Sequence, residues 1–162
     1  MKHLRTIAIV ALIGYAIYSY LGGADRDASG QIVSEGTLDA FSLRVGDCTN
    51  EPEASEDEEF AEIATVIAVP CDQPHDNEFY HVFDVVNRQE FSGDEAVYEE
   101  AFQGCYDQFE TFIGLDYESS VLEIYPIYPS AGSWAEGDRE VICGLYHIDF
   151  EKLTGSVKGL AI

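Results

Sequence analysis

Basic residues are scarce in this sequence, which has 8 Lys and Arg against 31 Asp and Glu and a formal net charge of −23. A field of this sign repels nucleic acid and anionic lipid, so we expect no nucleic-acid partner. The same charge keeps a domain soluble and attracts cationic partners or divalent metal. Two explanations stay open at this point: a functional acidic surface, or acidity shared by the whole proteome.

The sequence also lacks the short motifs of common enzyme classes. It has no serine nucleophile elbow, no phosphate-binding loop and no dinucleotide fingerprint. Its four cysteines include no Cys-x-x-Cys pair, which argues against a structural zinc site. We therefore predict no metal and no cofactor, and we expect the protein not to be an enzyme.

The sequence has a single long apolar run, which lies near the N-terminus. Residues 1–5 form a basic tip, and residues 6–24 carry no charged side chain and would span roughly 28 Å as a helix, close to the thickness of a bilayer core. Basic residues mark the cytoplasmic side, so the rest of the chain would face out. We predict a transmembrane signal-anchor; a cleaved signal peptide ending at Gly22-Gly23-Ala24 is the alternative. The polar segment 25–37 follows as a linker.

The outer domain, 38–162, combines strand and helix patterns and predicts an α+β fold, an antiparallel sheet with one main helix packed on it. Alternation predicts a short strand with Phe41, Leu43 and Val45 on one face. The segment Glu51–Glu59 is strongly acidic and predicts a solvated loop. Further strands are expected over 63–69, 79–86, 121–128 and 140–148, and Pro126 assigns the third of them to an edge or a bulge.

Alternation also assigns faces within the strand at 79–86. One face should carry Phe79, His81, Phe83 and Val85, and the other Tyr80, Val82, Asp84 and Val86. A helix should begin near Asp94, capped by Ser92 or Asp94, and end at Gly114. Its apolar stripe consists of Val97, Ala101, Phe102, Cys105, Phe109, Phe112 and Ile113.

Four cysteines in an outward-facing domain predict two disulfides, with three possible pairings. Cys105 lies in the apolar stripe of the helix, and Cys143 lies mid-strand on the face shared with apolar residues. Cys48 and Cys71 both follow short strands at turns. We therefore predict the pairs Cys48–Cys71 and Cys105–Cys143.

Polar residues gather where the first long strand pair turns. His75, Asp76 and Glu78, with His81 and His147 as further candidates, offer imidazole and carboxylate groups that zinc could use. A Cys71–His75 nucleophile is a second enzymatic hypothesis, which a disulfide would abolish. Two points favour a structural turn: Glu78 and His81 should lie on opposite strand faces, and an imidazole in a tight turn usually serves the backbone.

A second group lies near the C-terminal strand. Trp134 with Asp138 and Arg139 could form a binding edge, because an aromatic ring beside a guanidinium is a common recognition pair. The alternative, which we favour, is a structural corner in which the indole covers the core and Asp138 caps a turn.

Several of these segments together resemble the septum-formation family, which consists of actinobacterial envelope domains usually found behind a membrane helix. The resemblance covers about Leu43 to Gly159 and rests on the segments Leu43–Cys48, Val69–Glu78, Gly93-Asp94, Cys105, Trp134 to Arg139, Val141–Cys143 and Thr154–Gly159. It implies a place in the envelope and a link to cell division. It implies no catalytic residue.

We expect a single-pass cell-membrane protein whose outer domain is a non-enzymatic interaction module, an accessory subunit of an envelope membrane assembly. Septal machinery and a respiratory complex are both candidate hosts, and their subunits would present basic surfaces to this acidic domain. The competing class is an envelope enzyme or a ligand- or metal-binding domain that uses His75, Asp76 and Glu78.

Overall fold

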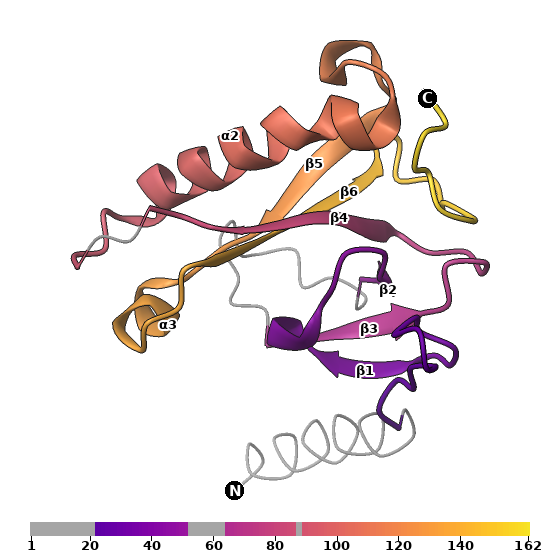
Figure 1. The fold of residues 1–162 in the computed structure, drawn as a ribbon, viewed down its shortest axis with the longest axis horizontal. Helices are drawn as coiled ribbons and strands as arrows, with labels where there is room; N and C mark the ends of the chain where they lie inside the picture. The colour runs from indigo at the N-terminus through magenta and orange to yellow at the C-terminus, as the bar shows by residue number, and fades with distance from the viewer. Residues whose placement is uncertain (1–21, 52–63, 87–88) are drawn as a thin grey trace, which may run out of the picture.

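The computed structural model describes residues 22–51, 64–86 and 89–162 of the chain (Figure 1). The predicted cytoplasmic tip, nearly all of the predicted membrane segment and most of the acidic loop lie outside these ranges. A search of the described ranges finds no helix with the length and apolarity needed to cross a membrane. The elements are β1 (Gly36–Asp39), η1 (Ala40–Ser42), β2 (Cys48–Asn50), β3 (Thr65–Val69), β4 (Asn77–Asp84), α2 (Asp94–Ile113), η2 (Tyr117–Ser119), β5 (Leu122–Ile127), α3 (Ala131–Ala135) and β6 (Glu140–His147).

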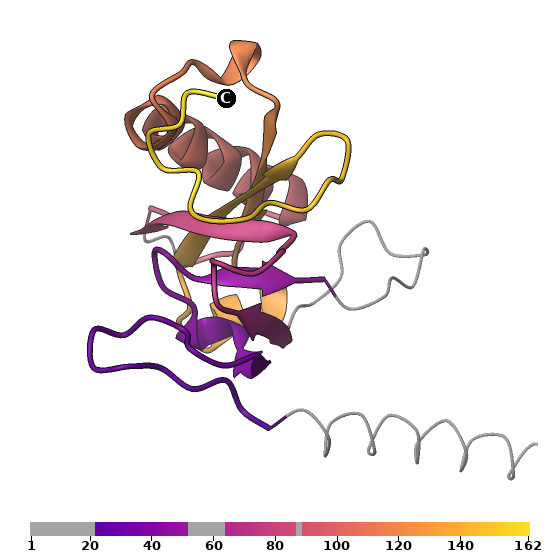
Figure 2. The same ribbon diagram turned by 90° about the vertical axis from the view of Figure 1, so that its right-hand side faces the viewer.

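The strands form a six-stranded antiparallel sheet in the order β1-β3-β2-β4-β6-β5. Helix α2 covers one face of its β4-β6-β5 half, whereas β1, β2 and β3 lie beside that half (Figures 1 and 2). The predicted α+β architecture is therefore confirmed. Pro126 lies in β5, an edge strand, where its missing N–H costs no ladder hydrogen bond.

The long helix has the predicted bounds and the predicted apolar face. Asp94 and Glu95 occupy its first turn, where negative charge is favourable, and Gly114 ends it with a left-handed φ of 84°. The predicted capping was wrong, because Gly93 holds the N-cap position and no side chain caps the helix there. The residues that α2 buries against the sheet are Val97, Ala101, Cys105, Phe109 and Ile113.

A β-bulge in β4 overturns the predicted assignment of faces. The register with β6 shifts between Phe79 and His81, which leaves Tyr80 as the extra residue. Phe79 consequently packs in a small cluster on the sheet face opposite the helix, while Tyr80 packs beneath α2 and donates its hydroxyl hydrogen to the Cys105 carbonyl at 2.8 Å. Alternation is interrupted at this bulge and resumes from His81 onward.

The strand predicted over Phe41, Leu43 and Val45 does not form. The side chain of Asp39 accepts a hydrogen bond from the Phe41 N–H and begins the single 3₁₀ turn η1 instead. As a result Phe41 and Val45 are 63% and 54% exposed, and only Leu43 is buried.

The segment predicted to be a linker lies against the domain. Ala24 donates its N–H to the Thr37 carbonyl, and Gly23 forms a bridge to Thr37 of β1. Arg26 bonds both oxygens of Asp47 at 2.6 Å. Residues 22–24, which we expected at the end of the membrane helix, are therefore extended chain attached to the sheet edge.

Candidate functional site

The polar turn between β3 and β4 is held by its own backbone and by a disulfide. Gln73 donates its N–H to the Pro70 carbonyl at 2.9 Å, and Pro70 and Pro74 restrict the chain on either side. Cys71 is bonded to Cys48 of β2, so the turn is fixed to the neighbouring strand. The second predicted pair, Cys105–Cys143, joins α2 to β6. Both predicted disulfides are confirmed.

His75 is fully buried in this turn and anchors the C-terminal segment through its backbone. Its N–H donates to the Leu153 carbonyl at 3.0 Å, and the Leu153 N–H donates back at 2.8 Å. The ring Nδ1 lies 2.8 Å from the Gln73 carbonyl oxygen, which can only accept, so Nδ1 carries the proton. Within the described part of the chain, Nε2 has no hydrogen-bond partner.

Glu78 is 1% exposed and also binds the C-terminal segment. One carboxyl oxygen accepts from the Ser156 hydroxyl at 2.5 Å, and the other accepts from the Val157 N–H at 2.8 Å. These bonds hold Val157 in the core beneath α2. Glu78 and His75 therefore connect the same turn to the same distant segment.

Asp76 differs from its neighbours because it lies nearer the surface. Its Oδ2 accepts from the Glu51 N–H at 2.9 Å and pairs with the Lys152 ammonium at 2.7 Å. With a quarter of its side chain exposed, this is a partly screened ion pair. Asp76 thus ties the end of β2 to the C-terminal segment.

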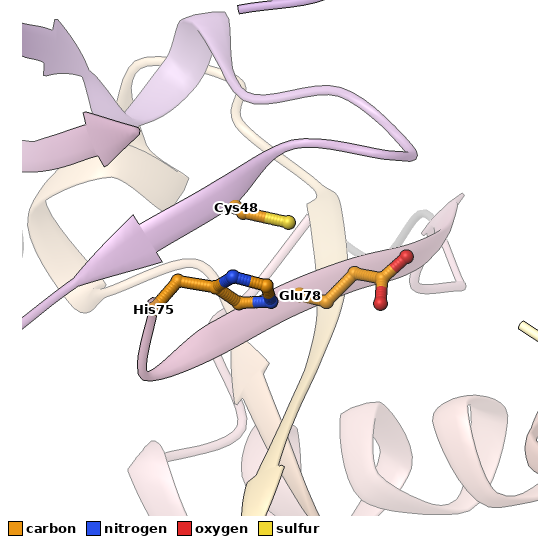
Figure 3. Close-up of side chains that lie close together, drawn as sticks. All are labelled: Cys48, His75 and Glu78. Atoms are coloured by element: carbon orange, nitrogen blue, oxygen red, sulfur yellow. The ribbon is translucent and has the colours of Figure 1, made fainter. Parts of the chain in front are cut away.

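Three potential ligand atoms converge in the interior of this turn. A sulfur of Cys48, a ring nitrogen of His75 and a carboxyl oxygen of Glu78 lie within 4.8 Å of one another, and all three residues are buried (Figure 3). With the disulfide formed, the Cys48 sulfur is neither a nucleophile nor a thiolate ligand. The same disulfide contradicts the Cys71–His75 nucleophile.

The other predicted histidines lie elsewhere. The bulge places His81 opposite Cys143 and Glu78 opposite Leu145, so these two side chains share a sheet face, contrary to the expectation from simple alternation. His81 nevertheless stacks on Phe83 and is not part of the three-residue cluster. His147 accepts a hydrogen bond from the Asp149 N–H at the end of β6.

The Trp134 group has the arrangement of a structural corner. The indole is 3% exposed, and the Arg139 guanidinium carbon lies 3.6 Å from the centre of its ring. Arg139 also donates to the Trp134 carbonyl, and Asp138 accepts from the Glu140 N–H at 3.0 Å. Because the ring is covered, it offers no exposed binding edge.

Two features of the site were not predicted from the sequence. The first is the Arg26–Asp47 pair, in which the hydrogen bond to Asp47 raises the pKa of Arg26 against the smaller, opposite effect of burial. The sequence signals for this pair were Arg26, the single basic residue of the polar segment 25–37, and Asp47, which follows Gly46. The second is the pair of hydrogen bonds from Ser156 and Val157 to Glu78. These residues follow Glu78 by 78 and 79 positions in the sequence.

Comparison with known proteins bears on the whole outer domain. A family model described as Septum formation matches residues 45–160, which include the disulfides, the polar turn and the C-terminal segment that the turn holds. No significant match to a curated protein or to a solved structure was found. Because the matched range covers most of the chain, the protein belongs to the septum-formation family.

Proposed function

We propose that this protein is a non-enzymatic interaction module, anchored in the cell membrane by residues 6–21 with its domain outside, and that it serves as an accessory subunit of the septal division assembly. Membership of the septum-formation family supports a role related to cell division. Two disulfides suit an oxidising compartment outside the membrane.

The non-enzymatic part of the proposal rests on the contacts of the polar-turn residues, which are made within the domain. The side chains of Asp76 and Glu78 are bonded to other segments of the domain, and His75 is fully buried and bonded to Gln73 and Leu153. Groups that act on a substrate must reach it. These groups instead hold the C-terminal segment on the sheet.

A partner with a basic surface fits the outer side of α2. Tyr106, Asp107, Glu110, Asp116 and Tyr117 line an open hollow of about 330 Å³ there. We call these five residues the acidic hollow. Three carboxylates beside two aromatic rings can receive lysine or arginine side chains through ion pairs and cation–π contacts.

The tyrosine hydroxyls of the acidic hollow are themselves held by carboxylates. Tyr106 donates to Glu118 at 2.7 Å, and Tyr117 donates to Glu123. The hydrogen bond to Glu118 is the largest cause that raises the pKa of Tyr106. Both phenols therefore stay neutral at ordinary pH, and their rings are fixed in place for contact with a partner.

The test is cross-linking and affinity purification of the full-length chain from membranes, with mass spectrometry of what is recovered. We expect division proteins with basic outer surfaces in the wild-type sample and their loss from the double variant Asp107→Lys/Glu110→Lys. The matched control, Asp149→Lys/Glu151→Lys, makes the same charge change at two exposed residues that do not line the hollow and should keep the partners. Recovery of the isolated protein alone, or equal loss in both variants, would contradict the proposal.

A further inference from the structure

The cluster of Cys48, His75 and Glu78 has the donor set of a transition-metal site. Sulfur, imidazole nitrogen and carboxylate oxygen are the three kinds of ligand that zinc takes from proteins. Around a tetrahedral ion such atoms stand roughly 3.5 Å apart, and here they lie within 4.8 Å of one another. A small inward movement would therefore bring them to coordinating positions.

The free nitrogen of His75 is the strongest sign of a missing ligand. Gln73 fixes the proton on Nδ1, so Nε2 presents a lone pair to the interior, where it finds no donor in the described part of the chain. Buried polar atoms without a partner are uncommon in native structures and call for an explanation. A hydrogen bond from Nδ1–H to a carbonyl is also the usual support for a histidine that ligates through Nε2.

Glu78 has matching support. The Ser156 hydroxyl and the Val157 N–H fix the orientation of its carboxyl group, and each oxygen keeps a second lone pair. Partners of this kind orient ligands in metal sites. Both non-sulfur ligands are thus already held in place by the fold.

The disulfide is what closes the site, and its position suits selective opening. Cys48 is fully buried whereas Cys71 is half-buried at the turn, and both sulfurs of the Cys105–Cys143 pair are fully buried. A thiolate of a dithiol reductant can attack the Cys71 sulfur, which breaks the S–S bond and releases Cys48 as a thiolate. The second thiol of the reductant then displaces Cys71, so the reductant becomes a disulfide and two electrons pass to the protein.

We propose that reduction of Cys48–Cys71 by such a dithiol opens a site for one divalent zinc ion, with Cys48 Sγ, His75 Nε2 and a Glu78 carboxyl oxygen as ligands and water in the fourth position. The Cys48 thiol gives up its proton when it binds the ion. The domain would then hold its turn by a disulfide under oxidising conditions and by a metal under reducing conditions. This property is independent of the partner-binding role proposed above.

Two single variants test the site without any reductant. Cys71→Ser leaves the buried Cys48 thiol inside the cluster, and Cys48→Ser leaves only the half-buried Cys71 thiol; both remove the same disulfide and keep Cys105–Cys143. We expect Cys71→Ser to bind one Zn²⁺ in calorimetry and to show a thiolate-to-metal absorption band with Co²⁺. Binding by Cys48→Ser should be weaker by more than the roughly 10–100-fold that loss of an outer-shell partner costs.

Adding His75→Ala to Cys71→Ser supplies the second arm. Circular dichroism first confirms that each variant is folded, and wild-type protein treated with a dithiol should reproduce the binding of Cys71→Ser. Equal affinity of the two cysteine variants, no binding by folded Cys71→Ser, or unchanged binding after loss of His75 would each overturn the proposal. Partner capture is measured separately on the oxidised chain, so failure of one proposal is distinguishable from failure of the other.

Discussion

Replacing Glu78 with Gln should release the C-terminal segment from the domain. The amide is nearly isosteric with the carboxyl group but has one acceptor oxygen instead of two, so either the Ser156 hydroxyl or the Val157 N–H faces an NH₂ group. A hydrogen bond to a charged group contributes about 1.5–3 kcal/mol, and an unsatisfied buried donor adds to the loss. We expect the free energy of unfolding to fall by about 2–3 kcal/mol.

The effect should be larger locally than a single bond suggests. Leu153 and Val157 are 6% and 3% exposed, and they stay buried only while the segment is attached. A loss of about 2 kcal/mol raises the detached population roughly 30-fold. Hydrogen exchange should therefore accelerate at Val157 and at Gly159, whose N–H donates to the Phe112 carbonyl.

Two measurements separate local release from global unfolding. Urea denaturation followed by the fluorescence of Trp134, the single tryptophan, reports the whole domain, and hydrogen exchange reports the segment. Ser156→Ala removes one donor without adding a repulsive group and should cost about 1 kcal/mol. The exposed control Glu151→Gln should stay within about 0.5 kcal/mol of wild type. Unchanged exchange at Val157 in Glu78→Gln would refute the role assigned to the carboxyl group.

Three further predictions concern other contacts. Arg26→Ala should lower the free energy of unfolding by about 3 kcal/mol in urea denaturation, because Asp47 would stay buried without its bidentate partner, and a cost below about 1 kcal/mol would refute this. Burial raises the pKa of the Tyr125 hydroxyl to about 12. The stabilisation that depends on the neutral phenol is therefore full below the unfolded pKa near 10 and is lost as the pH rises toward 12. Tyr125→Phe should make the free energy of unfolding depend less steeply on pH over this range, and an unchanged profile would contradict the argument. When the protein is treated with a low concentration of dithiol and then alkylated, mass spectrometry should detect alkylated Cys71 before alkylated Cys105, because the Cys105–Cys143 disulfide is buried. Simultaneous alkylation of both pairs would argue against selective access.

The elements that sequence patterns specify strongly were predicted correctly. The stripe that contains Cys105 fixes which side of the helix faces the sheet, and the alternation around Cys143 fixes the matching strand face, so their disulfide followed. Pro126 limited β5 to an edge strand or a bulge because proline cannot donate to a ladder, and β5 is an edge strand. These inferences depend on local geometry that a few neighbouring residues determine.

The features that the sequence did not reveal depend on single insertions or on distant contacts. The bulge at Tyr80 leaves the apolar alternation of β4 unbroken in the sequence, yet it reverses the face of every earlier residue. The 3₁₀ turn depends on one side-chain bond from Asp39. The hydrogen bonds of Glu78 to Ser156 and Val157 join segments that lie far apart in the sequence, so no residue near Glu78 indicates them.

The contacts made by residues 22–26 limit how the domain moves relative to whatever precedes it. A flexible tether would let the domain sample all orientations above the bilayer, but here Gly22, Ala24 and Arg26 are bonded to β1 and to Asp47. In the anchored arrangement proposed above, any swivel point must lie before Gly22. The acidic hollow on α2 would then turn together with residues 22–26 as one body, and its position relative to those residues would stay the same when a partner binds.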